Sequence, residues 1–261
     1  MKFYNSAKQS LSVPPRTTEN TRSQLLRHIV LTLGLILLIY DFSQAHDYWY
    51  ETDGQDYVLY RGHHHTEHKG EKVVPYAPSI VQKGHCLSPE GTIQTFGQLS
   101  QYPARIPGPC RSLTVEVDSG YWSQTWTETL NQSKENVSDA VFSWRALENT
   151  KLLNSWTPVQ SNRPLSHGLE ILLEKNPFVL ENGQKLRLLV MLEGKPLPGV
   201  TVAYDGNPRG VTGNDGRINV RIRHGGLQVL TGSIDEPPRD SQKADKLTRS
   251  AALFFELPED R

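Results

Sequence analysis

Short strand-like runs separated by turn residues fill the sequence from Leu165 onward, and this pattern restricts the fold more than any other feature. The runs cover residues 169–173, 185–192, 200–204, 218–222, 227–232 and 251–257. Between them stand Asn-Gly, Pro-Leu-Pro-Gly, Asp-Gly-Asn-Pro, Asn-Asp-Gly and His-Gly-Gly, all of which favour tight turns. Short strands joined by such turns predict an antiparallel β-sandwich of the immunoglobulin-like or prealbumin-like kind.

The sequence before Leu165 is predicted to be β-rich but less regular. Tyr57–Tyr60 and Leu113–Val117 have the composition or the alternation of strands. A helix is predicted from Ser138 to Trp156, because apolar residues recur there at helical spacing and Ser138 is suited to cap its start. With 20 glycines and 17 prolines, the chain is expected to be a strand-and-turn protein rather than a helical bundle.

We therefore predict a mainly β fold with two domains. Residues 46–163 are expected to form an irregular β-rich N-terminal domain containing one or two helices. Residues 164–261 are expected to form the C-terminal β-sandwich domain. Residues 1–45 are predicted to be a polar, disordered lead followed by a signal peptide.

The signal peptide prediction rests on the order of residues in this leader. Basic Arg22 and Arg27 precede an apolar run over residues 29–40, and Ser43-Gln44-Ala45 then places small residues at positions −3 and −1 before His46. The apolar run is shorter than the roughly 20 residues that span a bilayer as a helix. We expect cleavage before His46, a periplasmic location and no membrane span in the mature chain. An uncleaved inner-membrane anchor is the alternative.

Two cysteines remain in the predicted mature chain, Cys86 and Cys110. In an oxidising compartment such a pair is expected to form a disulfide. A pair of metal-binding thiolates is the alternative, but the spacing resembles no closely spaced zinc pair. The 28 basic and 28 acidic residues balance, so the composition provides no basic surface for nucleic acid.

Histidines are concentrated in the segment Arg61-Gly62-His63-His64-His65-Thr66-Glu67-His68-Lys69-Gly70. Imidazole suits Ni²⁺, Co²⁺, Cu²⁺ and Zn²⁺. In an extended segment His63 and His65 point to one face and His64 to the other, and a closing turn would bring His68 to the first pair. The predicted metal ligands are therefore His63, His64, His65 and His68, with His64 the weakest.

His46 strengthens this prediction. If cleavage makes it the first residue, its α-amino nitrogen and its Nδ1 can chelate one metal together. A third nitrogen from the segment 63–68 would complete a T-shaped or square site suited to Cu²⁺ or Ni²⁺. His85, beside Cys86, is a weaker candidate for an additional metal ligand. His167 and His224 are interpreted mainly as turn residues and are the weakest metal candidates.

The sequence resembles the NikM-like family of periplasmic nickel transport subunits over essentially all of residues 46–257. The resemblance is carried by His-Asp-Tyr-Trp at 46–49, the His-rich turn at 62–70, Gly-Leu-Glu-Ile at 168–171, Asn-Pro at 176–177, Gly-Gln-Lys-Leu at 183–186, Gly-Lys-Pro-Leu-Pro-Gly-Val at 194–200 and Gly-Asn-Asp-Gly-Arg at 213–217. It implies a protein that binds nickel, or cobalt, and accompanies a metal-uptake membrane transporter.

The expected function is therefore a periplasmic Ni²⁺-binding protein, with Co²⁺ and Cu²⁺ as alternative metals, and not an enzyme. The sequence contains no Gly-x-Ser-x-Gly, phosphate-loop or His-Glu-x-x-His motif. Two other classes stay open. One is a histidine-brace copper oxidoreductase, and the other is a structural secreted β-sandwich with weak, incidental metal binding.

Overall fold

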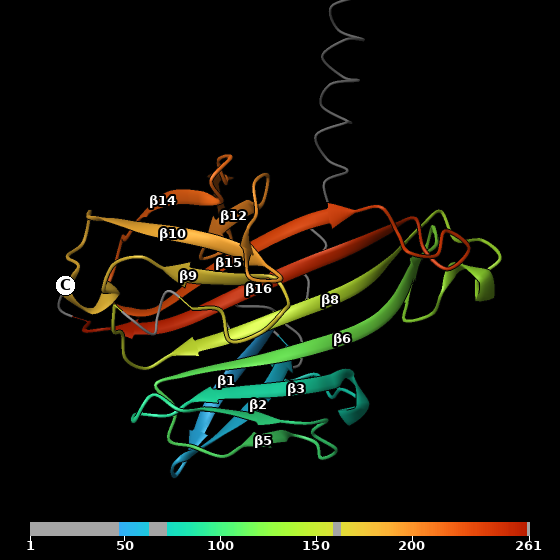
Figure 1. Ribbon diagram of the computed structural model, residues 1–261. Coiled ribbons are helices and arrows are strands. Elements are labelled where there is room, and N and C mark those ends of the chain that lie inside the picture. The colour runs from blue at the N-terminus through green and yellow to red at the C-terminus, as the bar shows by residue number, and fades with distance from the viewer. Residues whose placement is uncertain (1–46, 63–71, 159–162, 260–261) are drawn as a thin grey trace, which may run out of the picture. The chain divides into compact units, whose positions relative to one another are not determined.

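The computed structural model describes residues 47–62, 72–158 and 163–259, all within the compact unit His46–Arg261. Its largest element is a nine-stranded sheet (Figure 1). In spatial order its strands are β13 (Asn207–Val211), β12 (Thr201–Tyr204), β15 (Gly226–Glu236), β16 (Lys246–Leu257), β8 (Phe142–Leu153), β6 (Ser112–Gln124), β3 (Val81–Leu87) and β4 (Ile93–Phe96), with β7 (Thr129–Leu130) beside β6. Strands β8 and β16 are parallel, and the other neighbouring pairs are antiparallel.

Two smaller sheets accompany the large one. A four-stranded sheet contains β9 (Glu170–Leu173), β10 (Lys185–Leu192), β11 (Lys195–Pro196) and β14 (Arg217–Arg221). A three-stranded sheet contains β1 (Asp47–Asp53), β2 (Asp56–Gly62) and β5 (Ala104–Ile106). The helical segments in the described ranges are short 3₁₀ turns, η1 (Pro78–Ile80), η2 (Lys134–Asn136) and η3 (Pro177–Val179).

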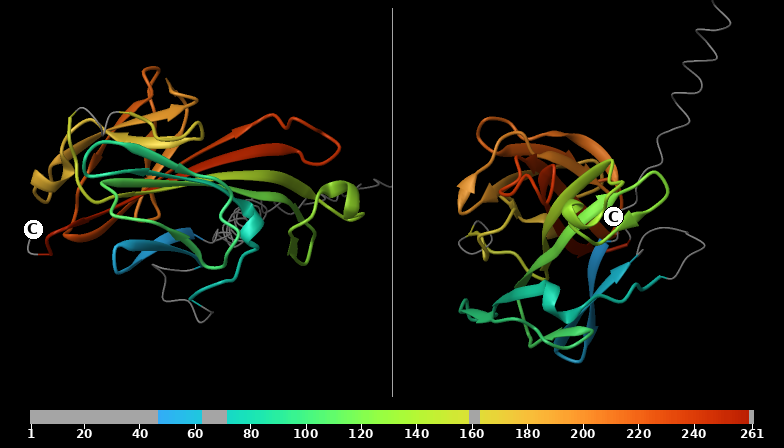
Figure 2. Two further views of the ribbon diagram at one scale, coloured as in Figure 1. Left: turned by 60° about the horizontal axis from the view of Figure 1, so that its bottom comes forward. Right: turned by 90° about the vertical axis from the view of Figure 1, so that its right-hand side faces the viewer.

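The smaller sheets pack on opposite faces of the large sheet, as the views in Figure 2 show. On β16, Phe255 belongs to the core shared with the four-stranded sheet, whereas its neighbour Phe254 packs with Trp49 of β1. Successive side chains of a strand point to opposite faces, so these two contacts lie on opposite sides of β16. The large sheet is thus the middle layer between two hydrophobic cores.

The predicted β-rich fold is confirmed, and several predicted strands coincide with observed ones. Lys185–Leu192 is β10 with the same bounds, and Tyr57–Tyr60 and Leu113–Val117 lie inside β2 and β6. The predicted disulfide is also confirmed: Cys86 and Cys110 are bonded, with their Cα atoms 5.4 Å apart. No helix in the described ranges is long and apolar enough to cross a membrane.

The predicted helix from Ser138 to Trp156 is wrong, because most of this segment is strand β8. Apolar side chains occur on both faces of β8, since a core lies on each side of the sheet. In addition, Asn149 and Lys151 are polar but buried, each with a hydrogen-bonded partner. The resulting pattern lacks the polar–apolar alternation of a half-buried strand and imitates helical spacing.

Candidate functional site

All five predicted metal ligands, His46, His63, His64, His65 and His68, lie outside the described residues. The described chain nevertheless defines where their segments are attached. Asp47 is paired with Gly62 across the β1–β2 hairpin, and Gly62 also forms a backbone bridge to Val73. The chain therefore leaves and re-enters this structure at the same end of the hairpin, beside the residue that follows His46.

Gly62 is required at this junction. Its φ is 148°, a backbone conformation that favours glycine, and a Cβ built there would lie 2.1 Å from the carbonyl oxygen of Lys72. The backbone N–H of Val74 donates to the carbonyl oxygen of Arg61 at 2.7 Å and closes the junction. Gly62 therefore allows two backbone segments to approach each other closely.

A stack of cations and aromatic rings connects this hairpin end to the large sheet. The Arg61 guanidinium lies 5.6 Å from the ring centroid of Trp122, whose ring stacks on Trp144 with centroids 6.4 Å apart. Trp144 stacks in turn on Phe142, and the ammonium group of Lys246 lies over Phe142. Because each ring face in the series has a neighbour, we interpret the stack as a device that holds the end of β2 against β6 and β8.

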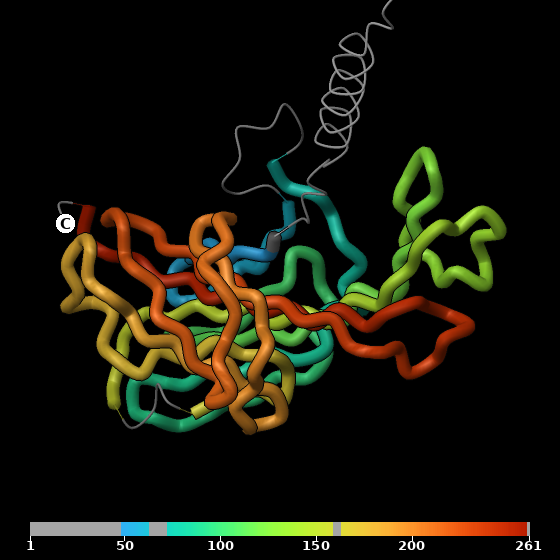
Figure 3. The backbone as a smooth tube through the Cα atoms, turned by 90° about the horizontal axis from the view of Figure 1, so that it is seen from above, coloured from blue at the N-terminus to red at the C-terminus, as the bar shows by residue number. Residues whose placement is uncertain are grey.

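This end of the sheet extends into long connections. Figure 3 shows the segment between β6 and β8 and the segment between β15 and β16 projecting together. Lys134 and Lys243 join the two segments through a backbone hydrogen bond of 3.0 Å, and Lys134 forms an ion pair with Asp245. The stack and these bonds together fix the surroundings of the hairpin end.

No group of three or more His, Cys, Asp or Glu side chains within the described ranges is arranged to hold a metal ion. His85 is buried in β3, with its Nε2 2.7 Å from Glu116 Oε1 and its Nδ1 3.1 Å from Thr95 Oγ1. The hydrogen bond from His85 is the main cause that lowers the pKa of Glu116. Since both ring nitrogens have partners, His85 has no free nitrogen to donate to a metal.

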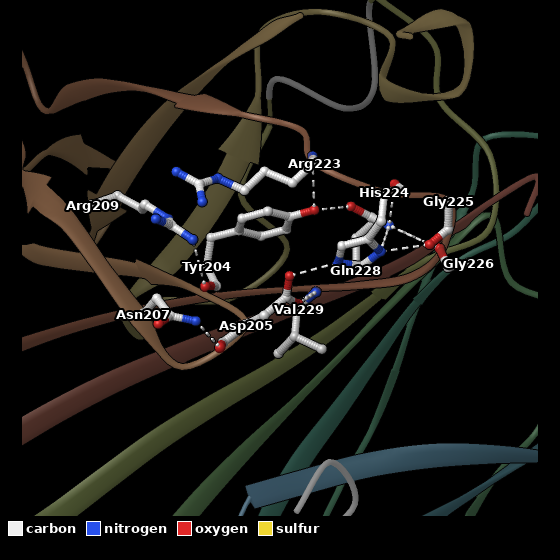
Figure 4. A network of polar contacts seen from close by, with 10 residues as sticks. All are labelled: Tyr204, Asp205, Asn207, Arg209, Arg223, His224, Gly225, Gly226, Gln228 and Val229. Carbon is white, nitrogen blue, oxygen red and sulfur yellow. Dashed lines mark hydrogen bonds and ion pairs between the residues drawn. The ribbon is translucent and has the colours of Figure 1, made fainter. Parts of the chain in front are cut away.

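His224 lies in the turn between β14 and β15, as predicted, within a polar network (Figure 4). Its Nδ1 lies 2.6 Å from the carbonyl oxygen of Gly225, and its Nε2 lies 2.8 Å from Asp205 Oδ2. Both oxygens are acceptors, so these two contacts favour the imidazolium form, which donates from both ring nitrogens. The Gly225 carbonyl first, and then Asp205, raise the pKa of His224. Both ring nitrogens of His224 therefore already have protein partners.

The same network extends into the core through Tyr204, whose ring stacks on the His224 ring with centroids 5.7 Å apart. The Tyr204 hydroxyl lies 2.5 Å from Gln228 Oε1, and Gln228 Nε2 donates to the backbone carbonyl oxygens of the turn. The buried Gln228 thus fixes the turn that carries His224. We therefore interpret the network as structural: it holds the turn between β14 and β15 against β12 and β15.

A buried ion pair that the sequence did not reveal holds the loop before β9. Lys151 Nζ and Glu170 Oε1 are 2.6 Å apart, and their side chains are 6% and 1% exposed. Glu170 also accepts from the backbone N–H groups of Leu165 and Ser166 and from the Ser166 hydroxyl. The only sequence signal was an acidic residue inside the apolar run 169–173. Because His167 follows Ser166 directly, this pair also fixes the loop that carries His167.

These features define a disulfide-bonded, three-layered β protein whose β1–β2 hairpin carries the attachment points of a histidine-rich segment. The chain belongs to a family described as a domain of unknown function (DUF4198), whose sequence profile matches residues 43–235. The match includes both strands of the hairpin. No curated protein matches the sequence. The resemblance to nickel transport subunits therefore stays a prediction.

Proposed function

We propose that this protein is a periplasmic transition-metal-binding protein that captures Ni²⁺, or alternatively Co²⁺, and delivers it to a metal-uptake membrane transporter. The proposed ligands are His46, with its α-amino group, and the imidazoles of His63, His64, His65 and His68. The role is binding and delivery, with no catalytic step.

The pairing of Asp47 with Gly62 is the observation that carries the proposal. His46 precedes one of these residues and His63 follows the other. Antiparallel partners have Cα atoms about 5 Å apart and each peptide adds about 3.8 Å, so covalent geometry limits the Cα atoms of His46 and His63 to a separation of about 13 Å. Two histidine side chains can close such a separation around a single metal ion.

Chemistry supports the same ligand set. Imidazole and amine nitrogens suit Ni²⁺, Co²⁺ and Cu²⁺, and the disulfide fits an oxidising compartment such as the periplasm. A free α-amino group has a pKa of about 8, so metal binding must displace its proton at neutral pH. Affinity should therefore fall in acid. At a nitrogen site Cu²⁺ binds more tightly than Ni²⁺, so nickel loading depends on coordination geometry or on metal supply.

Metal titration of the mature protein tests the proposal. We expect one tight equivalent of Ni²⁺, which is lost in the double variant His63→Ala, His65→Ala and retained in the control His167→Ala. Equal binding by the double variant and the parent protein would contradict the proposal. Binding only at millimolar metal, with no change in thermal stability, would instead identify a structural β-sandwich with incidental binding.

The terminal amine is tested separately by mass determination of the mature N-terminus and by adding one glycine before His46. The extension removes the amino-terminal chelate while preserving every histidine, so we expect weaker binding. Unchanged affinity would exclude the amine as a ligand. Bound copper that supports peroxide-dependent oxidation of a polysaccharide would replace the proposal with the histidine-brace alternative.

A further inference from the structure

A half-open cavity of about 230 Å³, lined by several polar and charged side chains, lies on the face of the large sheet opposite the β1–β2 hairpin. Its floor includes Glu116 of β6, Asn149 of β8 and Arg249 of β16. Arg249 lies on the same side of β16 as Phe255, which packs with the four-stranded sheet, because these two residues are an even number of positions apart in one strand. The cavity therefore borders the four-stranded sheet, on the face of the large sheet opposite the β1–β2 hairpin.

The floor side chains are held in place by partners outside the cavity. Glu116 accepts from His85, and Asn149 Nδ2 donates to Ser166 Oγ at 2.6 Å. Arg249 Nε donates to Glu236 at 2.8 Å. Each of the three side chains has a further oxygen or nitrogen that these bonds do not use. A floor that is ordered in this way loses little conformational entropy when a ligand binds.

The rim carries three charged or titratable side chains, those of His167, Glu193 and Arg239. None of the three forms a hydrogen bond or ion pair with another side chain in the part of the chain that the structure describes. The backbone N–H of Glu193 donates to the carbonyl oxygen of His167 at 3.0 Å, so two of the rim residues are fixed side by side. The rim therefore offers an imidazole, a carboxylate and a guanidinium to a ligand.

Size and charge together select the class of ligand. The volume of about 230 Å³ is below the range of about 300–1,000 Å³ that drug-sized ligands occupy, so the ligand is a small molecule. The lining carries both signs of charge, with carboxylates at Glu116 and Glu193 and guanidinium groups at Arg239 and Arg249. A further carboxylate, Asp118, has both oxygens engaged, one by Arg145 at 2.6 Å and the other by the backbone N–H of Gly120 at 3.1 Å. A ligand complementary to this lining carries one cationic and one anionic group.

We propose that this cavity binds a free α-amino acid. The guanidinium groups of Arg239 and Arg249 bind its carboxylate, and the carboxylates of Glu116 and Glu193 bind its ammonium group. Charge-assisted hydrogen bonds of this kind are stronger than neutral ones, and the guanidinium group matches a carboxylate geometrically. The site is a binding site that uses no metal, so it is independent of the proposed transition-metal function.

Calorimetric titration of the full chain with each standard amino acid, in buffer containing EDTA, tests the proposal. We expect saturable binding of at least one amino acid. Propionate and ethylammonium, which each carry only one of the two charges, should not bind. EDTA removes free metal, so binding by a chelating amino acid cannot be attributed to a metal complex.

The variants Arg239→Ala and Glu193→Ala should each weaken the binding of that amino acid about tenfold or more, since each removes one charge-assisted contact. Both residues are exposed, so circular dichroism should show an unchanged fold. The control Arg223→Ala removes an exposed guanidinium far along the chain from the cavity and should leave affinity unchanged. Absence of binding by every amino acid, or equal affinity in both rim variants and the parent protein, would overturn the proposal.

Discussion

Replacing Glu170 with glutamine is expected to destabilise the fold severely, because it breaks a buried ion pair while preserving side-chain size. The Lys151 ammonium group, 6% exposed, would then face a neutral amide at the distance where it now meets a carboxylate at 2.6 Å. Both Glu170 oxygens now accept hydrogen bonds from Leu165 or Ser166. In glutamine one of these oxygens becomes an NH₂ group, which would face those donors and could not accept from them.

The magnitude follows from these contacts. Breaking one partner of a buried ion pair costs about 3–5 kcal/mol, because the remaining charge stays buried without compensation. The matched control is Asp53→Asn, which breaks the exposed pair between Asp53 and Arg105, whose side chains are 58% and 50% exposed. Exposed pairs contribute about 0–1 kcal/mol, so the control should differ little from the parent protein.

Urea unfolding under non-reducing conditions measures both variants. The free energy of unfolding should fall by about 3–5 kcal/mol for Glu170→Gln and by less than about 1 kcal/mol for Asp53→Asn. The double variant Glu170→Leu, Lys151→Met should be less destabilised than the sum of its two single variants, because neither charge is left alone. A loss of less than about 1 kcal/mol in Glu170→Gln would refute the buried-pair argument.

Three further predictions concern the disulfide, the hairpin junction and the His224 turn. Replacing Cys86 and Cys110 together with serine should cost about 3 kcal/mol in urea unfolding, since it restores loop entropy to the unfolded chain, and reductant should then have no effect. Gly62→Ala should lower both the melting temperature and the affinity for Ni²⁺. Gly54→Ala is the control for the melting temperature, because Gly54 also has a positive φ but a Cβ there has open space, so this variant adds backbone strain without a steric clash. The raised pKa of His224 means that its stabilising contribution is complete below the unfolded value of about 6.5 and is lost as pH rises through the folded value. His224→Gln should abolish this loss in stability measurements across that pH range, and an unchanged pH profile would contradict the imidazolium assignment.

The strands of the C-terminal part were predictable because their signals are local. The run 185–192 is rich in apolar residues and bounded by turn residues, and it forms β10 with those bounds. The turn at His224 was likewise predicted from the glycines that follow it. In each case the residues that set the local backbone are neighbours in the sequence, so no distant contact was needed to identify the element.

Strand β8 was not predictable in this way. Asn149 and Lys151 are buried because Ser166 and Glu170, from the loop and strand that follow, supply their partners. The parallel pairing of β8 with β16 joins residues about 100 positions apart and places segments from both sides of residue 163 in one sheet. Local periodicity carries no information about such a pairing.

For the candidate metal site, the sequence likewise indicated residue types but not their arrangement. Its histidines were identified from clustering alone, and they stay predictions because the structure describes none of them. The turn of the hairpin was signalled only weakly, by Gly54 between two strand-like runs. Its register, which pairs Asp53 with Asp56, had no signal in the sequence.

The sequence by itself determined the chemistry that this protein can present: a histidine-rich segment, a pair of cysteines, and strands separated by turns. The tertiary structure alone decided which of these groups meet. It occupied both nitrogens of His85 and set Asp47 opposite Gly62. The physical reason is that strand pairing and burial depend on the free energy of contacts between distant residues, whereas residue type and spacing report only on neighbours.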